Sequence, residues 1–242
     1  MIYSLRRKLK GFSGVKNFYL WALRLLPVHT RYEINRKLRS PYSTLEDDKK
    51  IIYIHIPKAA GNALIKSLYG VSATGHDLLS RYKDNNESKF NLYYKFAVVR
   101  NPFDRFVSSF FYLKQGGIGF FDDDFAKKYL SGIETFEEFV LKINSDKKFE
   151  AAVMSWIHFV PQIDFLSLDG STIGVDRVVK LEQINDSLSD LCTDLKIPLV
   201  EMKRDNASKR AAYKEYYTPE LKEVVGRLYE KDLNVLQYSF EG

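Results

Sequence analysis

Residues 51–62 read IIYIHIPKAAGN and predict a strand that runs into a tight turn bearing a lysine. Their first four residues are β-branched or aromatic, as is typical of a buried strand. Apolar residues with helical spacing follow the turn, at Leu64, Ile65 and Leu68. A turn between a strand and a helix start brings free backbone N–H groups to the positive end of the helix dipole. The stretch therefore predicts a seat for an anion.

A second stretch, residues 96–108, repeats this design and reads FAVVRNPFDRFVS. Arg100 follows an apolar strand, Pro102 suits the first turn of a helix, and Ser108 comes about two turns later. A guanidinium and a hydroxyl suit the geometry of a phosphate. Two anion seats on neighbouring strands indicate a ligand that carries two separated phosphates.

Both stretches resemble motifs of the sulfotransferases, especially the carbohydrate sulfotransferases of family 2, whose donor is 3'-phosphoadenosine 5'-phosphosulfate (PAPS). The first resembles a His-Ile-Pro-Lys motif that binds the 5'-phosphosulfate. The second resembles an Arg-Asn-Pro-x-x-Arg-x-x-Ser motif that binds the 3'-phosphate. Further similar segments lie at residues 158–162, 178–182 and 216–232, so that the resemblance covers about residues 51 to 240. It implies a PAPS-dependent sulfotransferase with a glycan or polysaccharide acceptor.

The resemblance assigns the donor site to ten residues. In the first loop this chain has alanines and an asparagine where the family usually has hydroxyl groups, so that backbone N–H groups and the Asn62 amide take their place. We expect no metal ion, because the motif of magnesium-dependent P-loop enzymes is missing. The predicted donor-binding residues are Lys58, Ala59, Ala60, Gly61, Asn62, Ala63, Arg100, Ser108, Ser208 and Lys209.

Three residues are predicted to take part in an in-line sulfuryl transfer. Lys58 would meet the charge that develops on the leaving phosphate. A histidine would remove the proton of the acceptor hydroxyl. His76 is the preferred base because it lies between the two motifs, where many sulfotransferases carry theirs, and His158 is the second choice. Glu182 is an acidic alternative that we expect to anchor the following helix, and Arg105 is either a structural or a binding residue.

Alternating strands and helices predict an α/β fold, with a P-loop-like, mostly parallel sheet flanked by helices on both faces. We divide the chain into a basic, amphipathic N-terminal helical arm, residues 1–50, and a sulfotransferase-like α/β domain, residues 51–242. The polar residues 82–89 are predicted to form a loop. Residues 120–132 follow a glycine-rich break and are predicted to form a loop that is either mobile or faces the acceptor.

The positive charge is confined to one end of the chain. The whole chain carries +6, but residues 1–40 hold ten Lys or Arg against one acid, a net of +9, so that the other 202 residues sum to −3. This distribution argues against a nucleic-acid partner. The arm either contacts an anionic membrane surface or packs on the domain. A lone cysteine, Cys192, and an apolar stretch too short to span a bilayer favour a cytoplasmic protein.

Two other functions remain open from the sequence. A non-catalytic protein that binds a glycan or a membrane on a sulfotransferase-like fold would explain the missing loop hydroxyls, although Lys58, Arg100 and His76 argue against it. A P-loop kinase would require Gly-x-x-x-x-Gly-Lys-Ser/Thr and an acidic metal-binding strand, and neither occurs here.

Overall fold

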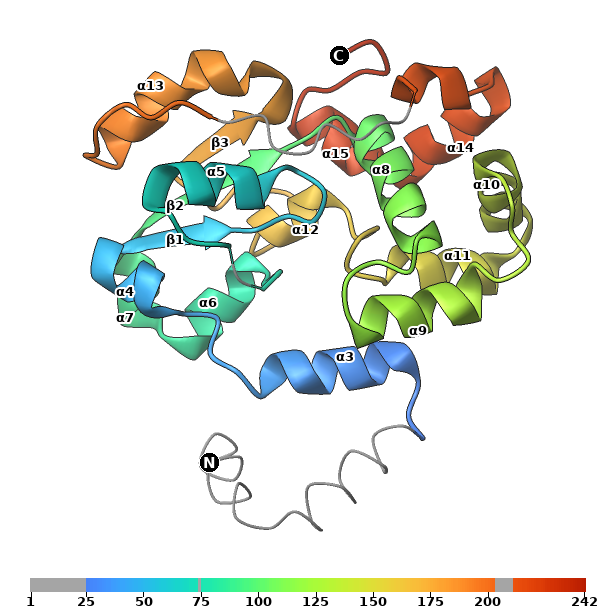
Figure 1. Ribbon diagram of the computed structural model, residues 1–242, viewed down its shortest axis with the longest axis horizontal. Helices are drawn as coiled ribbons and strands as arrows, with labels where there is room; N and C mark the ends of the chain where they lie inside the picture. Colours follow the sequence, from blue (N-terminus) through green and yellow to red (C-terminus); the bar gives the residue numbers. More distant parts are fainter. Residues whose placement is uncertain (1–24, 74, 203–210) are drawn as a thin grey trace.

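The computed structural model describes residues 25–73, 75–202 and 211–242 (Figure 1). Within them, the strands β1 (Ile51–Ile54), β2 (Tyr94–Val99) and β3 (Arg177–Lys180) form a parallel sheet in the order β1-β2-β3. Ile54 pairs with Ala97, which pairs on its other side with Val178. Because the strands are parallel, their carboxyl ends reach the same edge of the sheet. The predicted α/β fold with a parallel sheet is confirmed.

Helices cover the sheet and also form a separate helical part of the molecule (Figure 1). Their bounds are α3 Val28–Lys37, α4 Thr44–Lys49, α5 Gly61–Tyr69, α6 Leu79–Asn85, α7 Glu87–Leu92, α8 Pro102–Lys114, α9 Phe120–Tyr129, α10 Phe136–Ser145, α11 Lys147–Met154, α12 Gln162–Leu166, α13 Ile184–Asp194, α14 Pro219–Leu228 and α15 Glu230–Val235, with short 3-10 turns at η2 Leu181–Gln183 and η3 Tyr213–Tyr216.

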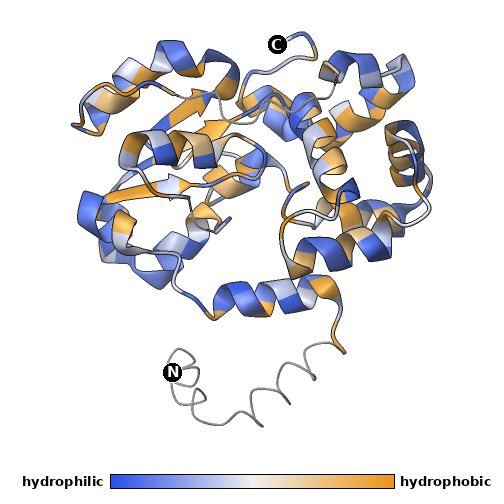
Figure 2. Cartoon of the chain, viewed as in Figure 1, coloured by the Kyte–Doolittle hydropathy of each residue, from blue (hydrophilic) through white to orange (hydrophobic). Residues whose placement is uncertain are grey.

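The apolar side chains divide between two cores. One surrounds the sheet, where all four residues of β1 are buried and belong to the same cluster as Phe96 of β2 and Ile65 of α5. The other lies among α8, α9, α10, α11 and α14 and is dominated by aromatic rings such as Phe106 and Phe139. Figure 2 shows the strands in hydrophobic colours and most helices with one polar face. Helix α8 directly follows β2 and belongs to the second core, so it connects the two cores.

Both loops that the sequence predicts are helical in the structure. Residues 82–89 lie mostly in α6 and α7, and Asn86 caps α7 by accepting the N–H of Lys89. Residues 120–129 form α9, which begins after Gly119 with φ of 94°. The glycine-rich run therefore acts as a short connection between two helices, and the acidic residues after it suit a helix N-terminus.

The segment before the sheet packs on the helical part. In α3, Arg31 forms an ion pair of 2.7 Å with Asp124 of α9, and the ring of His29 lies 2.9 Å from the carbonyl oxygen of Ala152. In the described residues, no helix is both long enough and apolar enough to cross a bilayer. The domain boundary at residue 50, membrane contact through residues 1–40 and a cytoplasmic location stay predictions.

Candidate active site

The turn after β1 has an unusual backbone shape. Lys58 and Ala60 have positive φ angles of 67° and 57°, a region that residues with a side chain rarely adopt. Helix α5 starts immediately afterwards, and the N–H groups of Ala63 and Leu64 both reach the carbonyl of Ala60, at 3.1 and 3.3 Å. Gly61 and Asn62 belong to the first turn, whose N–H groups have no acceptor within the helix. They are the donors that this turn offers to an anion.

Gly61 is required by the packing behind the turn. A Cβ atom at this position would lie 2.2 Å from the hydroxyl oxygen of Tyr53 and 2.5 Å from the ring of His55. The neighbouring Ala59 is fully buried, whereas Asn62 is exposed and its amide is accessible. Ala60 and Ala63 are partly buried. The predicted loop residues therefore present their backbone and the Asn62 amide, rather than hydroxyl groups.

The second motif forms the junction of β2 and α8. The side chain of Asn101 caps the helix by accepting the N–H of Phe103 at 3.0 Å, and Pro102 occupies the first turn. Arg100 ends the strand, and its Nε donates to Asp104 at 2.8 Å. Ser108 is partly buried and lies on the same face of α8 as Asp104, which is four residues earlier. Arg100 and Ser108 thus flank one face of the helix start.

The structure brings the two motifs into contact. Arg100 Nη1 donates to the carbonyl oxygen of Lys58 at 3.0 Å, and the fully buried Arg105 donates through Nε to that of Pro57 at 3.0 Å. The Lys58 ammonium lies 4.1 Å from the centre of the Tyr112 ring on α8. Arg105 therefore holds the turn in place from the interior, which is a structural role.

Three histidines form a cluster next to this turn. Nδ1 of His76 lies 2.8 Å from the carbonyl oxygen of His55, and Nδ1 of His55 lies 3.0 Å from that of Gly75. Since a carbonyl oxygen only accepts, both Nδ1 atoms carry hydrogen and both Nε2 atoms carry a lone pair. The centre of the His76 ring is 4.3 Å from that of His55 and 5.9 Å from that of His158. The two predicted bases are thus neighbours.

The comparison with known protein families agrees with this arrangement. The sulfotransferase family matches residues 41–239, a range that holds both motifs and the histidine cluster. This chain belongs to the sulfotransferase family. It is therefore a sulfotransferase, and PAPS is the typical sulfuryl donor of the family. No curated protein and no solved structure gives a significant match to the chain.

Burial controls the charge of the histidines in this sulfotransferase. It lowers the pKa of His76 well below its ordinary value of 6.5, and the nearby rings of His55 and His158 act in the same direction. Burial also lowers the pKa of His158, against the opposing effect of the Asp122 carboxylate. The pKa of His55 falls to about 4, mainly for the same reason. All three side chains are therefore neutral near pH 7, the state in which a histidine accepts a proton.

Two residues of this site, Tyr112 and Asp122, were not predicted from the sequence. The Tyr112 ring underlies the Lys58 ammonium, and its hydroxyl donates to Oδ2 of Asp122 at 2.7 Å. Oδ1 of Asp122 lies 3.1 Å from Nε2 of His158. The spacing of Ser108 and Tyr112, four residues apart on one helix, was the only available signal for Tyr112. Asp122 lay in the segment predicted as a loop.

The remaining predicted residues lie elsewhere. Glu182 accepts the backbone N–H of Asn101 at 2.7 Å and the hydroxyl of Tyr238 at 2.8 Å. It therefore anchors the start of α8 and not, as was predicted, the helix that follows it in the sequence. Ser208 and Lys209 lie outside the described residues.

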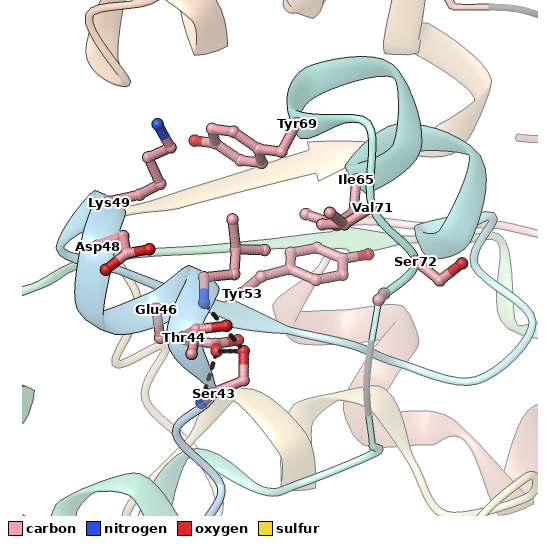
Figure 3. A pocket seen from close by; sticks show the side chains of 12 residues that line it. Ser43, Thr44, Glu46, Asp48, Lys49, Tyr53, Ile65, Tyr69, Val71 and Ser72 are labelled. Carbon is pink, nitrogen blue, oxygen red and sulfur yellow. Dashed lines mark hydrogen bonds between the residues drawn. The ribbon is translucent and has the colours of Figure 1, made fainter.

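A cavity of about 360 Å³ lies at the opposite end of β1, between α4 and the end of α5 (Figure 3). Figure 3 shows the Tyr53 ring crossing it toward Ser72, with Glu46 and Tyr69 among the other lining residues. The residues that line this cavity include none of the predicted site residues. Tyr53 links it to the site, because the Tyr53 hydroxyl reaches the space beside Gly61.

Proposed function

We propose that this sulfotransferase transfers the sulfuryl group of PAPS to a hydroxyl group of a carbohydrate, by in-line displacement with His76 as the base. The observation that carries the proposal is the hydrogen bond from Arg100 to the carbonyl of Lys58. It ties together the two segments that resemble the phosphosulfate-binding and the phosphate-binding motifs. A single donor molecule with two phosphate groups is thereby able to contact both.

The residues at this junction fit such a donor. The start of α5 offers the N–H groups of Gly61 and Asn62 to one phosphate. Among the described residues, the contacts of Arg100 with Asp104 and Lys58 use three of the five guanidinium N–H groups, which leaves two for a second phosphate. The hydroxyl of Ser108 lies on the same face of α8 as Asp104. PAPS supplies an activated sulfuryl group on a phosphate leaving group.

Lys58 is suited to stabilise the charge that appears when the donor is cleaved. Its backbone is fixed by the left-handed turn and by Arg100, and its ammonium lies on the face of Tyr112. A cation held in place before the reaction costs little reorganisation when negative charge develops on the leaving phosphate. Lys58 therefore acts on the leaving group, and the base lies in the histidine cluster.

His76 is better placed than His158 to act as the base. Its Nδ1–H is fixed by the carbonyl of His55, which leaves the lone pair on Nε2 to take the proton of the acceptor hydroxyl. His76 is only partly buried, whereas His158 is 5% exposed and its Nε2 is held by Asp122. We therefore assign proton removal to His76 and a supporting position to His158.

An exposed aromatic side chain two residues before Asp122 is suited to contact a sugar ring. Phe120, at the start of α9, is 52% exposed, and the guanidinium of Arg31 lies 5.2 Å from its ring centre. Trp156 is buried and stacks on Phe125, so it belongs to the core. Phe120 thus supports a carbohydrate acceptor, together with the resemblance to the carbohydrate sulfotransferases.

The test is transfer of labelled sulfate from PAPS to a panel of glycans. Wild-type protein should form product, and Lys58→Ala should lower kcat by about 10²- to 10³-fold, as expected when a charge-stabilising group is lost. Lys148→Ala is the matched control, because Lys148 is an exposed lysine on α11. Protein that binds 3'-phosphoadenosine 5'-phosphate (PAP) but sulfates no glycan would refute the carbohydrate assignment. Stabilisation by ATP with magnesium, but not by PAP, would instead support a kinase.

A further inference from the structure

Asp122 occupies a position that the transfer reaction does not itself explain. It lies in the first turn of α9 and is 8% exposed, although a carboxylate normally stays in water. Its two neighbours, Asp123 and Asp124, are only partly buried and pair with Lys127 and Arg31. A buried carboxylate is retained only where hydrogen bonds or charges compensate for its loss of hydration.

Both oxygen atoms of Asp122 accept a hydrogen bond from a residue of the site. Oδ2 accepts from the hydroxyl of Tyr112 at 2.7 Å, and Oδ1 accepts from Nε2 of His158 at 3.1 Å. The N–H of Ile118 donates to the Tyr112 oxygen at 2.8 Å, so the hydroxyl proton points to Asp122. These bonds, against the opposing effect of burial, hold the pKa of Asp122 below its ordinary value. Both carboxylate oxygens of Asp122 therefore act as hydrogen-bond acceptors.

Each of these bonds fixes a group next to a reacting residue. On one side, Tyr112 is held at its hydroxyl, and the face of its ring carries the ammonium of Lys58. On the other side, His158 keeps its hydrogen on Nε2, and its ring stands edge to face with that of His76. Nδ1 of His158 is buried and has no hydrogen-bond partner among the described residues, so Asp122 is what determines this tautomer.

We propose that Asp122 is a positioning residue for sulfuryl transfer, which places Lys58 through Tyr112 and places His76 through His158. The proposal rests on the function proposed above. Asp122 touches neither substrate. It holds the Lys58 ammonium and the His76 ring in fixed positions relative to each other. Helix α9 thereby links the residue that stabilises the leaving group to the residue that removes the proton.

The decisive variant is Asp122→Asn, which keeps the size of the side chain but offers only one acceptor atom. Its amide oxygen is able to serve Tyr112 or His158, but not both. If the oxygen serves Tyr112, the NH2 group faces His158, whose hydrogen must then move to Nδ1. We expect kcat to fall about 10- to 100-fold through misplacement of the reacting groups, with an unchanged Kd for PAP. Nitrogen NMR of the imidazole distinguishes the two orientations. The His158 hydrogen moves to Nδ1 if the oxygen serves Tyr112, and it stays on Nε2, with the bond from the Tyr112 hydroxyl lost, if the oxygen serves His158.

Two further variants complete the test. Asp123→Asn, one residue later and paired with a surface lysine, should keep the wild-type kcat. Tyr112→Phe keeps the ring under Lys58 but removes its hydroxyl, and should lower kcat less than Asp122→Asn. In the double variant of Asp122→Asn and Tyr112→Phe, the fold-loss of kcat should be smaller than the product of the two single fold-losses, because both residues act through one network.

Several results would overturn the proposal. They are an Asp122→Asn enzyme with the kcat of Asp123→Asn, fully multiplicative losses in the double variant, and a loss of PAP affinity equal to the loss of kcat. If wild-type protein itself transfers no sulfate, the proposed function is what fails. In that case an Asp122→Asn protein in which the His158 nitrogen signals and the Tyr112 hydroxyl proton signal are both unchanged would show separately that Asp122 does not fix the cluster.

Discussion

The site has two halves that are built in different ways. We define the donor half as residues 57–63 with Arg100 and Ser108, and the acceptor half as His55, His76, His158 and Asp122. In the donor half, the anion seat consists of backbone: two positive φ angles and the open first turn of α5. In the acceptor half, the geometry depends on side chains that contact each other across 21 and 36 residues of sequence. Apart from Lys58, which acts on the leaving group, substitutions should therefore separate donor binding from turnover.

The largest effect is expected in the acceptor half, for His76→Asn. The new amide nitrogen is able to keep the bond to the carbonyl of His55, while the lone pair on Nε2 is lost. Loss of a general base lowers kcat by about 10²- to 10⁴-fold. The affinity for PAP, measured by calorimetry, should stay at the wild-type value because the donor half is untouched.

The matched control is His29→Gln, since a nitrogen of His29 also contacts a backbone carbonyl but lies on α3. Its kcat should equal that of the wild type. The pH profile gives a second check, because the groups around His76 (the rings of His55 and His158, and Arg39) act with burial to lower its pKa. Rates should hold as the pH falls to 6.5 and decline only below it. A fall of the wild-type rate centred above pH 6.5 would exclude His76 as the base. A kcat of His76→Asn equal to that of His29→Gln would exclude it as well.

A smaller effect, on the donor half, is expected for Gly61→Ala. The added methyl group would meet the Tyr53 hydroxyl and the His55 ring, so the turn must shift. Overpacking of this kind costs about 1–3 kcal/mol of stability, measured by denaturant unfolding. The shift also moves the N–H groups at the start of α5, so that PAP affinity should fall together with stability. Gly226→Ala on α14, where an added Cβ would make only an ordinary contact of 3.7 Å with the Phe103 ring, is the control for helix propensity. An unchanged PAP affinity in Gly61→Ala would contradict the assigned seat.

The sequence predicted the donor half far better than the acceptor half. A strand, a turn with Lys58 and a helix start are encoded by neighbouring residues, and Arg100 follows the next strand, so parallel strands suffice to bring them together. Asp122 has no such local signal. It is the first of three consecutive acidic residues, which ordinarily indicate a solvated surface, and only tertiary packing buries the first and leaves the next two partly exposed. Helix α9 was not predicted either, because the glycine-rich run before it indicated a loop.

The smallest effect tests where the two halves meet, at the adjacent residues Ser108 and Ser109 of α8. Ser108 is assigned to the 3'-phosphate, so Ser108→Ala should weaken PAP binding by about 1–2 kcal/mol, or roughly 5- to 30-fold in Kd, with little change in stability. Ser109 is fully buried and donates to the carbonyl oxygen of His158 at 2.8 Å. Ser109→Ala should therefore lower stability by about 1 kcal/mol and leave the Kd for PAP unchanged. If both variants changed the same quantity, the two faces of α8 would not divide the site, and the distinction between a donor half and an acceptor half would fail.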